Sequence, residues 1–208
     1  MRIEFLGVSG SGKTFMAERL YPDLKKKYPN IRWPSKRLYQ DYSHVTRNFI
    51  KLFYVSIYTL SHLKWVLKLC SVISDTITGT FSQRCVLSFN GIYLKREIER
   101  NKNVSTVFDE GVAQYVWALC LRKGELLQKD EFQSIIQLFD CPEVVYVICA
   151  SPKTIAMRIR ERGRRVYIQK ADDMESAIKC MQEIQNGIIE YFTDLGQALK
   201  MVIIENES

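Results

Sequence analysis

Short runs of β-branched and apolar residues alternate along the chain with longer stretches in which apolar residues recur at helical spacing. The short runs predict strands at residues 2–6, 31–33, 104–108, 144–149 and 201–204, of which 31–33 is weak and is closed by Pro34. The longer stretches predict helices at 13–24, 81–100, 112–122, 132–139, 152–162 and 174–195, and two more within 41–78. Because helices separate the strands, the strands should pair in parallel. The pattern predicts an α/β fold in which a five-stranded parallel sheet carries helices on both faces.

The length and composition are those of one globular domain. The chain has 208 residues, and no repeat or linker rich in Pro, Gly or Ser divides it, so we expect a single domain over 1–208. The six cysteines form no C-x-x-C pair and the sequence contains two histidines, a composition that does not favour a structural zinc site. Reduced cysteines and a cytoplasmic location are expected.

Basic residues outnumber acidic ones, and the formal net charge is +7. Such a charge attracts polyanions, among them nucleotide phosphates, nucleic acid and acidic membrane surfaces. The sequence contains no recognisable nucleic-acid-binding module, so nucleic acid is not an expected partner.

The apolar stretch at 52–73 resembles a membrane-spanning segment at first sight. Lys64, Lys68 and His62 interrupt it, and its unbroken apolar part is about half of the ~20 residues that a spanning helix needs. We interpret it as a helix that is buried in the core, lies in a homodimer interface, or contacts a membrane surface peripherally. The sequence leaves these three alternatives open.

The strongest chemical signal is the segment GVSGSGKT at 7–14. It matches G-x-x-x-x-G-K-[ST] at every fixed position, directly between the first predicted strand and the first predicted helix. The glycines let backbone N–H groups surround a phosphate at the helix N-terminus, and Lys13 adds a positive charge at the outer phosphates. Thr14 is the expected Mg²⁺ ligand. The residues predicted to bind ATP are Gly7, Ser9, Gly10, Ser11, Gly12, Lys13 and Thr14.

Two acids follow the strand predicted at 104–108. Asp109 and Glu110 stand at its carboxyl end, where open parallel sheets bind their ligands. A carboxylate in this place can orient the Mg²⁺ shell or accept the proton of an attacking hydroxyl. We favour Asp109 for these roles, as metal-binding and catalytic residue, and keep Glu110 as the competing catalytic base.

Together, GVSGSGKT and FDEGVAQYV resemble the thymidylate kinase and deoxynucleoside kinase group of P-loop kinases. The resemblance implies a P-loop NTPase fold of three α/β/α layers with a helical acceptor and lid region, here an insertion at about 35–100. In that group an acid–arginine pair follows the third strand, and Glu110 stands here where the arginine would be. The resemblance also implies that Gln114 faces the acceptor. Arg37, within the insertion, is a further candidate for acceptor binding.

Five arginines crowd the end of the helix predicted at 152–162. Arg158 and Arg162 are four residues apart and share a face, and Arg160 lies between them. The resemblance implies an arginine-rich lid at about 158–173 that closes over the phosphates. Arginine suits this role because its planar guanidinium binds phosphoryl oxygens in pairs. We expect Arg158 and Arg162 to be catalytic and Arg160 to bind the nucleotide.

These observations predict an enzyme that uses ATP and Mg²⁺ to phosphorylate a small acceptor. A nucleoside or nucleoside monophosphate is the acceptor that the resemblance implies. One alternative is a kinase for a carbohydrate or a lipid-linked glycan. Another, of a different class, is a nucleotide-dependent switch or binding protein, although the sequence has no N-K-x-D guanine signature.

Overall fold

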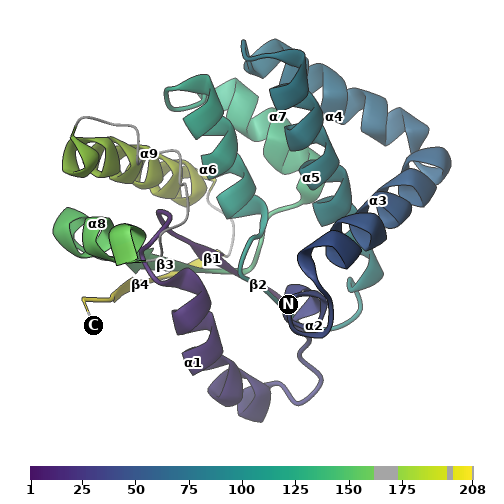
Figure 1. Ribbon diagram of the computed structural model, residues 1–208. Helices are drawn as coiled ribbons and strands as arrows, with labels where there is room; N and C mark the ends of the chain where they lie inside the picture. The colour runs from purple at the N-terminus through teal and green to yellow at the C-terminus, as the bar shows by residue number, and fades with distance from the viewer. Residues whose placement is uncertain (162–172, 196–198, 208) are drawn as a thin grey trace.

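The computed structural model describes residues 1–161, 173–195 and 199–207, except for the side chains of 37–40 and 44. Four strands and nine helices are present in these residues (Figure 1). In chain order they are β1 (Arg2–Leu6), α1 (Lys13–Lys27), α2 (Pro34–Asp41), α3 (His44–Ser61), α4 (Leu63–Thr76), α5 (Phe81–Arg100), β2 (Thr106–Phe108), α6 (Val112–Lys123), α7 (Lys129–Phe139), β3 (Val144–Cys149), α8 (Pro152–Glu161), α9 (Met174–Asp194) and β4 (Lys200–Glu205).

The strands form one parallel sheet in the order β2-β1-β3-β4. The prediction of a fifth strand at 31–33 was wrong: the described residues form four strands, and 31–33 contributes a single bridge. Arg32 alone pairs with Thr106: its N–H donates to the Ser105 carbonyl at 2.9 Å, and its carbonyl accepts from the Val107 N–H at 2.8 Å. Pro34 then supplies no N–H and begins α2, so the pairing stops after one bridge.

The predicted helices are confirmed, with small shifts at their ends. Gly124 ends α6 in the left-handed conformation, at a φ of 85°. At the start of α8, the Ser151 hydroxyl accepts from the Thr154 N–H at 3.2 Å, as expected of an N-cap. The long stretch at 41–78 divides at His62 into α3 and α4, while the short helix α2 was not predicted.

Alternate residues of β1 face opposite layers of the molecule. Ile3 and Phe5 pack with Met16 and Ala17 of α1, on the lower face of the sheet in Figure 1. Leu6 belongs instead to the larger core cluster, which helices α3 to α9 form with Val145 and Val147 of β3. The helices on both faces agree with the predicted layered α/β architecture.

A charged pair is buried inside this sheet. Glu4 is fully buried, and its carboxylate lies 2.9 Å from Nε of Arg2. The other carboxylate oxygen accepts from the backbone N–H of Ala113, at 2.9 Å, and so caps the first turn of α6. Arg2 also donates to the carbonyls of Phe139 and Asp140, at 3.2 and 2.5 Å. The pair therefore joins β1 to the start of α6 and the end of α7.

The helices α3, α4 and α5 form a separate layer beyond α6, on the right of Figure 1. The Tyr58 hydroxyl of α3 donates to Glu99 of α5 at 2.8 Å, and Trp65 of α4 donates to the Leu138 carbonyl at 3.2 Å. Among the described residues, no helix is both long enough and apolar enough to cross a membrane.

We predict that Glu4→Gln destabilises the protein by about 3 kcal/mol, because it leaves the Arg2 guanidinium buried without its counter-charge. Glu205→Gln, on the exposed end of β4, is the matched control and should change stability by less than about 0.5 kcal/mol. Urea unfolding measures both values. Equal stability of the two variants would show that the buried pair contributes nothing.

Candidate active site

The phosphate loop occupies residues 7–12, between β1 and α1. Gly10 and Gly12 have φ values of 91° and 92°, and Gly12 is the N-cap of α1. The Ser11 N–H closes a tight turn onto the Val8 carbonyl at 3.0 Å. A Cβ atom at Gly7 would lie 2.6 Å from the Ser11 hydroxyl and 2.8 Å from the Ile148 carbonyl. The loop conformation therefore depends on glycine at these positions.

Residues near the end of the chain stabilise this loop through hydrogen bonds to its backbone carbonyls. Asn206 follows β4, and its side-chain amide donates to the Ser11 carbonyl at 2.8 Å. Arg158 of α8 donates to the carbonyls of Gly10 and Ser11, at 3.3 and 3.2 Å, and to that of Asn206 at 3.0 Å. Arg158 was expected to be catalytic, and in this structure its guanidinium contacts the backbone of the phosphate loop. The sequence analysis missed Asn206, since an asparagine after a strand has no distinctive pattern.

The polar groups of the loop are suited to bind an anion. Lys13 Nζ lies 2.6 Å from the Gly7 carbonyl oxygen and 3.4 Å from that of Val8, at the mouth of the loop. The buried Ser11 hydroxyl has no hydrogen-bond partner among the described residues. Thr14 is exposed in the first turn of α1, and Ser9 is half-buried. An orphaned hydroxyl beside a lysine and a helix N-terminus fits a bound phosphate group.

Asp109 is buried and tightly held. One of its oxygens accepts from the Ser35 hydroxyl at 2.5 Å and from the indole N–H of Trp33 at 3.2 Å. The indole N–H also donates to the Ser35 hydroxyl, at 2.8 Å. The acid therefore anchors the start of α2 to the end of β2.

Glu110 instead faces a cavity of about 260 Å³ beside the loop. Its lining includes polar side chains from four helices (Ser35, Lys51, Asn90, Tyr93, Glu97 and Gln114). Although solvent reaches the Glu110 carboxylate through the cavity, the surrounding protein restricts its hydration, and this raises its pKa. The negative charge of Asp109 raises the pKa further, while Lys13 and Lys51 lower it.

Lys51 supplies a positive charge to the same cavity from α3. Its ammonium lies 5.0 Å from the centre of the Tyr93 ring. Burial lowers its pKa, and the nearby charge of Glu110 opposes that effect. The sequence analysis did not identify Lys51, because one lysine in an apolar helix looks like a surface residue until α3 is packed against α5.

Gln114 connects the cavity to the phosphate loop. It lines the cavity from the first turns of α6, and its Oε1 accepts from the Gly7 N–H at 3.2 Å. The resemblance implied a glutamine near the acceptor, and Gln114 lies at the wall that both spaces share.

Other predicted residues lie away from this centre or outside the described part of the chain. Arg160 is exposed on α8. Arg37 is on α2, but its side chain is not among those described, and Arg162 with most of the expected lid falls in the undescribed range 162–172. In the described residues no group of three or more His, Cys, Asp or Glu side chains is arranged to hold a metal ion.

We predict that Gly12→Ala reduces ATP affinity at least about tenfold. The new methyl group would collide with the Asn206 amide and would strain a left-handed backbone, so the loop would lose its shape. Gly124→Ala is the matched control, since its φ is 85° but no atom lies within 4 Å of the added carbon. Calorimetric titration with a non-hydrolysable ATP analogue measures both affinities. Similar losses in the two variants would mean that backbone strain alone is responsible.

Comparison with known proteins supports the fold. No protein-family model and no curated protein matches the sequence. Among solved structures, a thymidylate kinase from Ehrlichia chaffeensis has a TM-score of 0.52 and 13% identity, over 100% of this chain and 88% of that chain. A deoxyadenosine kinase from M. mycoides with bound dATP has a TM-score of 0.47 and 14% identity, over 99% and 91%. The chain therefore has the fold of thymidylate kinase, which the resemblance of its two motifs had predicted.

Proposed function

We propose that the protein is an ATP- and Mg²⁺-dependent kinase that transfers the γ-phosphoryl group to a small acceptor, most simply a nucleoside or nucleoside monophosphate. The observation that carries the proposal is the shared wall between the phosphate loop and the Glu110 cavity. Gln114 contacts Gly7 and lines that cavity, and Lys13 is close enough to influence the pKa of Glu110. A phosphoryl donor and an acceptor bound in these adjoining spaces would meet beside the carboxylate.

The donor half of the reaction is assigned to the loop. Backbone N–H groups of the loop other than those of Gly7 and Ser11 bind the β- and γ-phosphates, together with the α1 N-terminus and Lys13. Arg158 and Asn206 keep the loop rigid. Mg²⁺, when bound, offsets charge on the phosphate oxygens. Thr14 and Asp109 are the residues proposed to hold it, together with phosphate oxygens and water, because Mg²⁺ is often held by few protein ligands. We retain Arg160 as a nucleotide-binding candidate, and Arg158 and Arg162 as catalytic ones.

The acceptor half is assigned to the cavity. Glu110 accepts the proton of the acceptor hydroxyl while the hydroxyl oxygen forms a bond to the γ-phosphorus. The bond between that phosphorus and the β–γ bridging oxygen breaks, and ADP is released. The raised pKa of Glu110 lies nearer to neutral pH than that of an ordinary carboxyl group, which suits a general base. Asp109, fixed by Trp33 and Ser35, orients the base and the metal shell. Lys51 and Gln114 position the acceptor, and Arg37 stays a candidate for the same role.

The chemistry of the cavity narrows the acceptor. Glu110 stands where the resembled kinases carry arginine, and a carboxylate repels a phosphate group. A neutral hydroxyl acceptor is therefore favoured over a monophosphate. A nucleoside fits this description, and so does a sugar, which keeps the carbohydrate kinase as the alternative. The small volume of about 260 Å³ also supports a compact acceptor.

We expect Lys13→Ala to abolish acceptor-dependent ADP formation. We expect Asp109→Asn to lower kcat by about 100-fold with little change in ATP affinity. Lys27→Ala, at the far end of α1, is the control for Lys13. The assay couples ADP release to a panel of nucleosides, nucleoside monophosphates and sugars. Near-normal turnover by Lys13→Ala would remove the phosphate loop from the mechanism. If the protein instead binds a partner protein only when nucleotide is present, and turns over no acceptor, the alternative of a nucleotide-dependent switch would be favoured.

The pH dependence of kcat/KM provides a second test. Only the ionised Glu110 acts as a base, so activity should fall as the pH drops through its raised pKa, above the ordinary carboxyl range. Lys51→Met removes a charge that lowers this pKa and should move the acid limb to higher pH. Asp109→Asn removes a charge that raises it and should move the limb to lower pH. Shifts in the same direction, or full activity of Glu110→Gln, would contradict the assignment of the base.

A further inference from the structure

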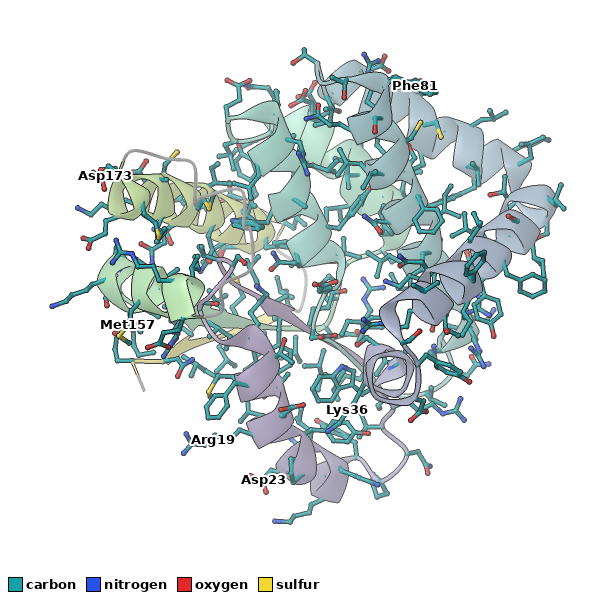
Figure 2. The ribbon with its side chains drawn as sticks, in the orientation of Figure 1. Arg19, Asp23, Lys36, Phe81, Met157 and Asp173 are labelled. Atoms are coloured by element: carbon teal, nitrogen blue, oxygen red, sulfur yellow. The ribbon has the colours of Figure 1, made fainter. Side chains whose placement is uncertain are left out.

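The outer face of α3 and the start of α4 is apolar, and none of the residues that the structure describes covers it. Large apolar side chains are more than half exposed there, up to 86% for Leu60 and 68% for Phe49. The set, which we call the α3–α4 face, comprises Val45, Phe49, Leu52, Phe53, Ile57, Leu60, Leu63 and Leu67. Side chains project from the outer sides of these two helices into solvent in Figure 2. An exposed apolar area of this extent marks an interaction surface rather than ordinary surface variation.

The α3–α4 face is one side of a helix whose other side belongs to the protein. Val55 and Tyr58 are buried against the core, and Lys51 reaches the Glu110 cavity. The residues on the outer side, at 45, 49, 52, 53, 56, 57 and 60, recur at helical spacing and carry no charge. Within α3, Val55 and Tyr58 therefore belong to the core, whereas the outward side chains do not, because they are exposed.

Charge determines which partner fits the face. No Asp or Glu occurs from residue 42 to residue 74, whereas Arg47, Lys51, Lys64 and Lys68 lie in this range. Lys64 and Lys68 are exposed on α4 beside Leu63 and Leu67. Glu99 of α5, the acid that contacts the inner side of α3, already accepts from Tyr58 and lies 3.8 Å from His62. A second copy of the chain would bring the same cations and no complementary acid from this segment.

We propose that the α3–α4 face docks on the surface of an anionic phospholipid bilayer. The apolar side chains of α3 enter the boundary between headgroups and acyl chains, with the helix lying parallel to the surface, and Lys64 and Lys68 contact lipid phosphates and carboxylates. The net charge of +7 adds long-range attraction to the same surface. Docking places α3, and with it the Lys51 wall of the cavity, next to the bilayer. The inference does not depend on the proposed kinase activity.

The test is co-sedimentation of the full chain with vesicles of phosphatidylcholine alone or with about one quarter phosphatidylserine. The expected result is binding to the phosphatidylserine vesicles, reduced at high salt because the headgroup attraction is screened. Phe49→Ser with Phe53→Ser should weaken binding at least about tenfold, because both rings lose their place in the bilayer. Lys64→Glu with Lys68→Glu should remove the preference for phosphatidylserine.

Ile203→Thr is the matched control, since Ile203 is an exposed apolar residue on β4, away from this face, and its loss should leave vesicle binding unchanged. Thermal unfolding by circular dichroism shows that each variant is folded. Absence of binding to either vesicle, or binding that survives the Phe49 and Phe53 changes, overturns the proposal. A dimer seen by light scattering that those two changes dissociate, without vesicle binding, also overturns it by showing that a second copy covers the face.

Discussion

The arrangement of the candidate site depends on one buried carboxylate. Glu4 lies in the central strand β1, directly before the phosphate loop, and it accepts the N–H of Ala113 in the first turn of α6. That contact sets the distance between the loop and the Asp109-Glu110 turn. Glu4 lies three residues before the loop, and Ala113 lies three residues after Glu110. Arg2 offsets the charge of Glu4 and ties α7 to the same point. A buried ion pair is costly to create, and here it joins the sheet to the helix that carries Gln114.

The stiffness of the phosphate loop has a second origin at the far end of the chain. The Asn206 amide and the Arg158 guanidinium donate to carbonyls on the outer side of the loop, and the Asn206 N–H donates to the Cys149 carbonyl at 2.8 Å. These bonds fix the backbone carbonyls of Gly10 and Ser11 and so restrict the conformation of the loop. The loop geometry is thus shared between a local glycine pattern and contacts that span nearly the whole sequence.

Sequence patterns predicted the elements whose signal is local. The strands at 2–6 and 144–149 and the helix at 81–100 agree with the structure closely, because hydrophobic period and capping decide them. The strand at 31–33 was wrong, since its apolar residues pack on α1 while Pro34 prevents more than one bridge. Lys51, Trp33, Ser35 and Asn206 could not be assigned to the site from sequence, because each reaches it through long-range packing. The motif at 7–14 could be identified because its chemistry is contiguous.

The short segment around Trp33 and α2 also solves a problem of sheet edges. β2 has three residues and lies at one edge, where unpaired N–H and C=O groups can recruit a strand from another molecule. The single bridge of Arg32 occupies part of that edge, and α2 packs directly beside it. Because Trp33 and Ser35 bind Asp109, the acid that we propose for the site also keeps this cover in place. Loss of the acid would therefore expose a strand edge and promote aggregation, independently of its proposed role in the reaction.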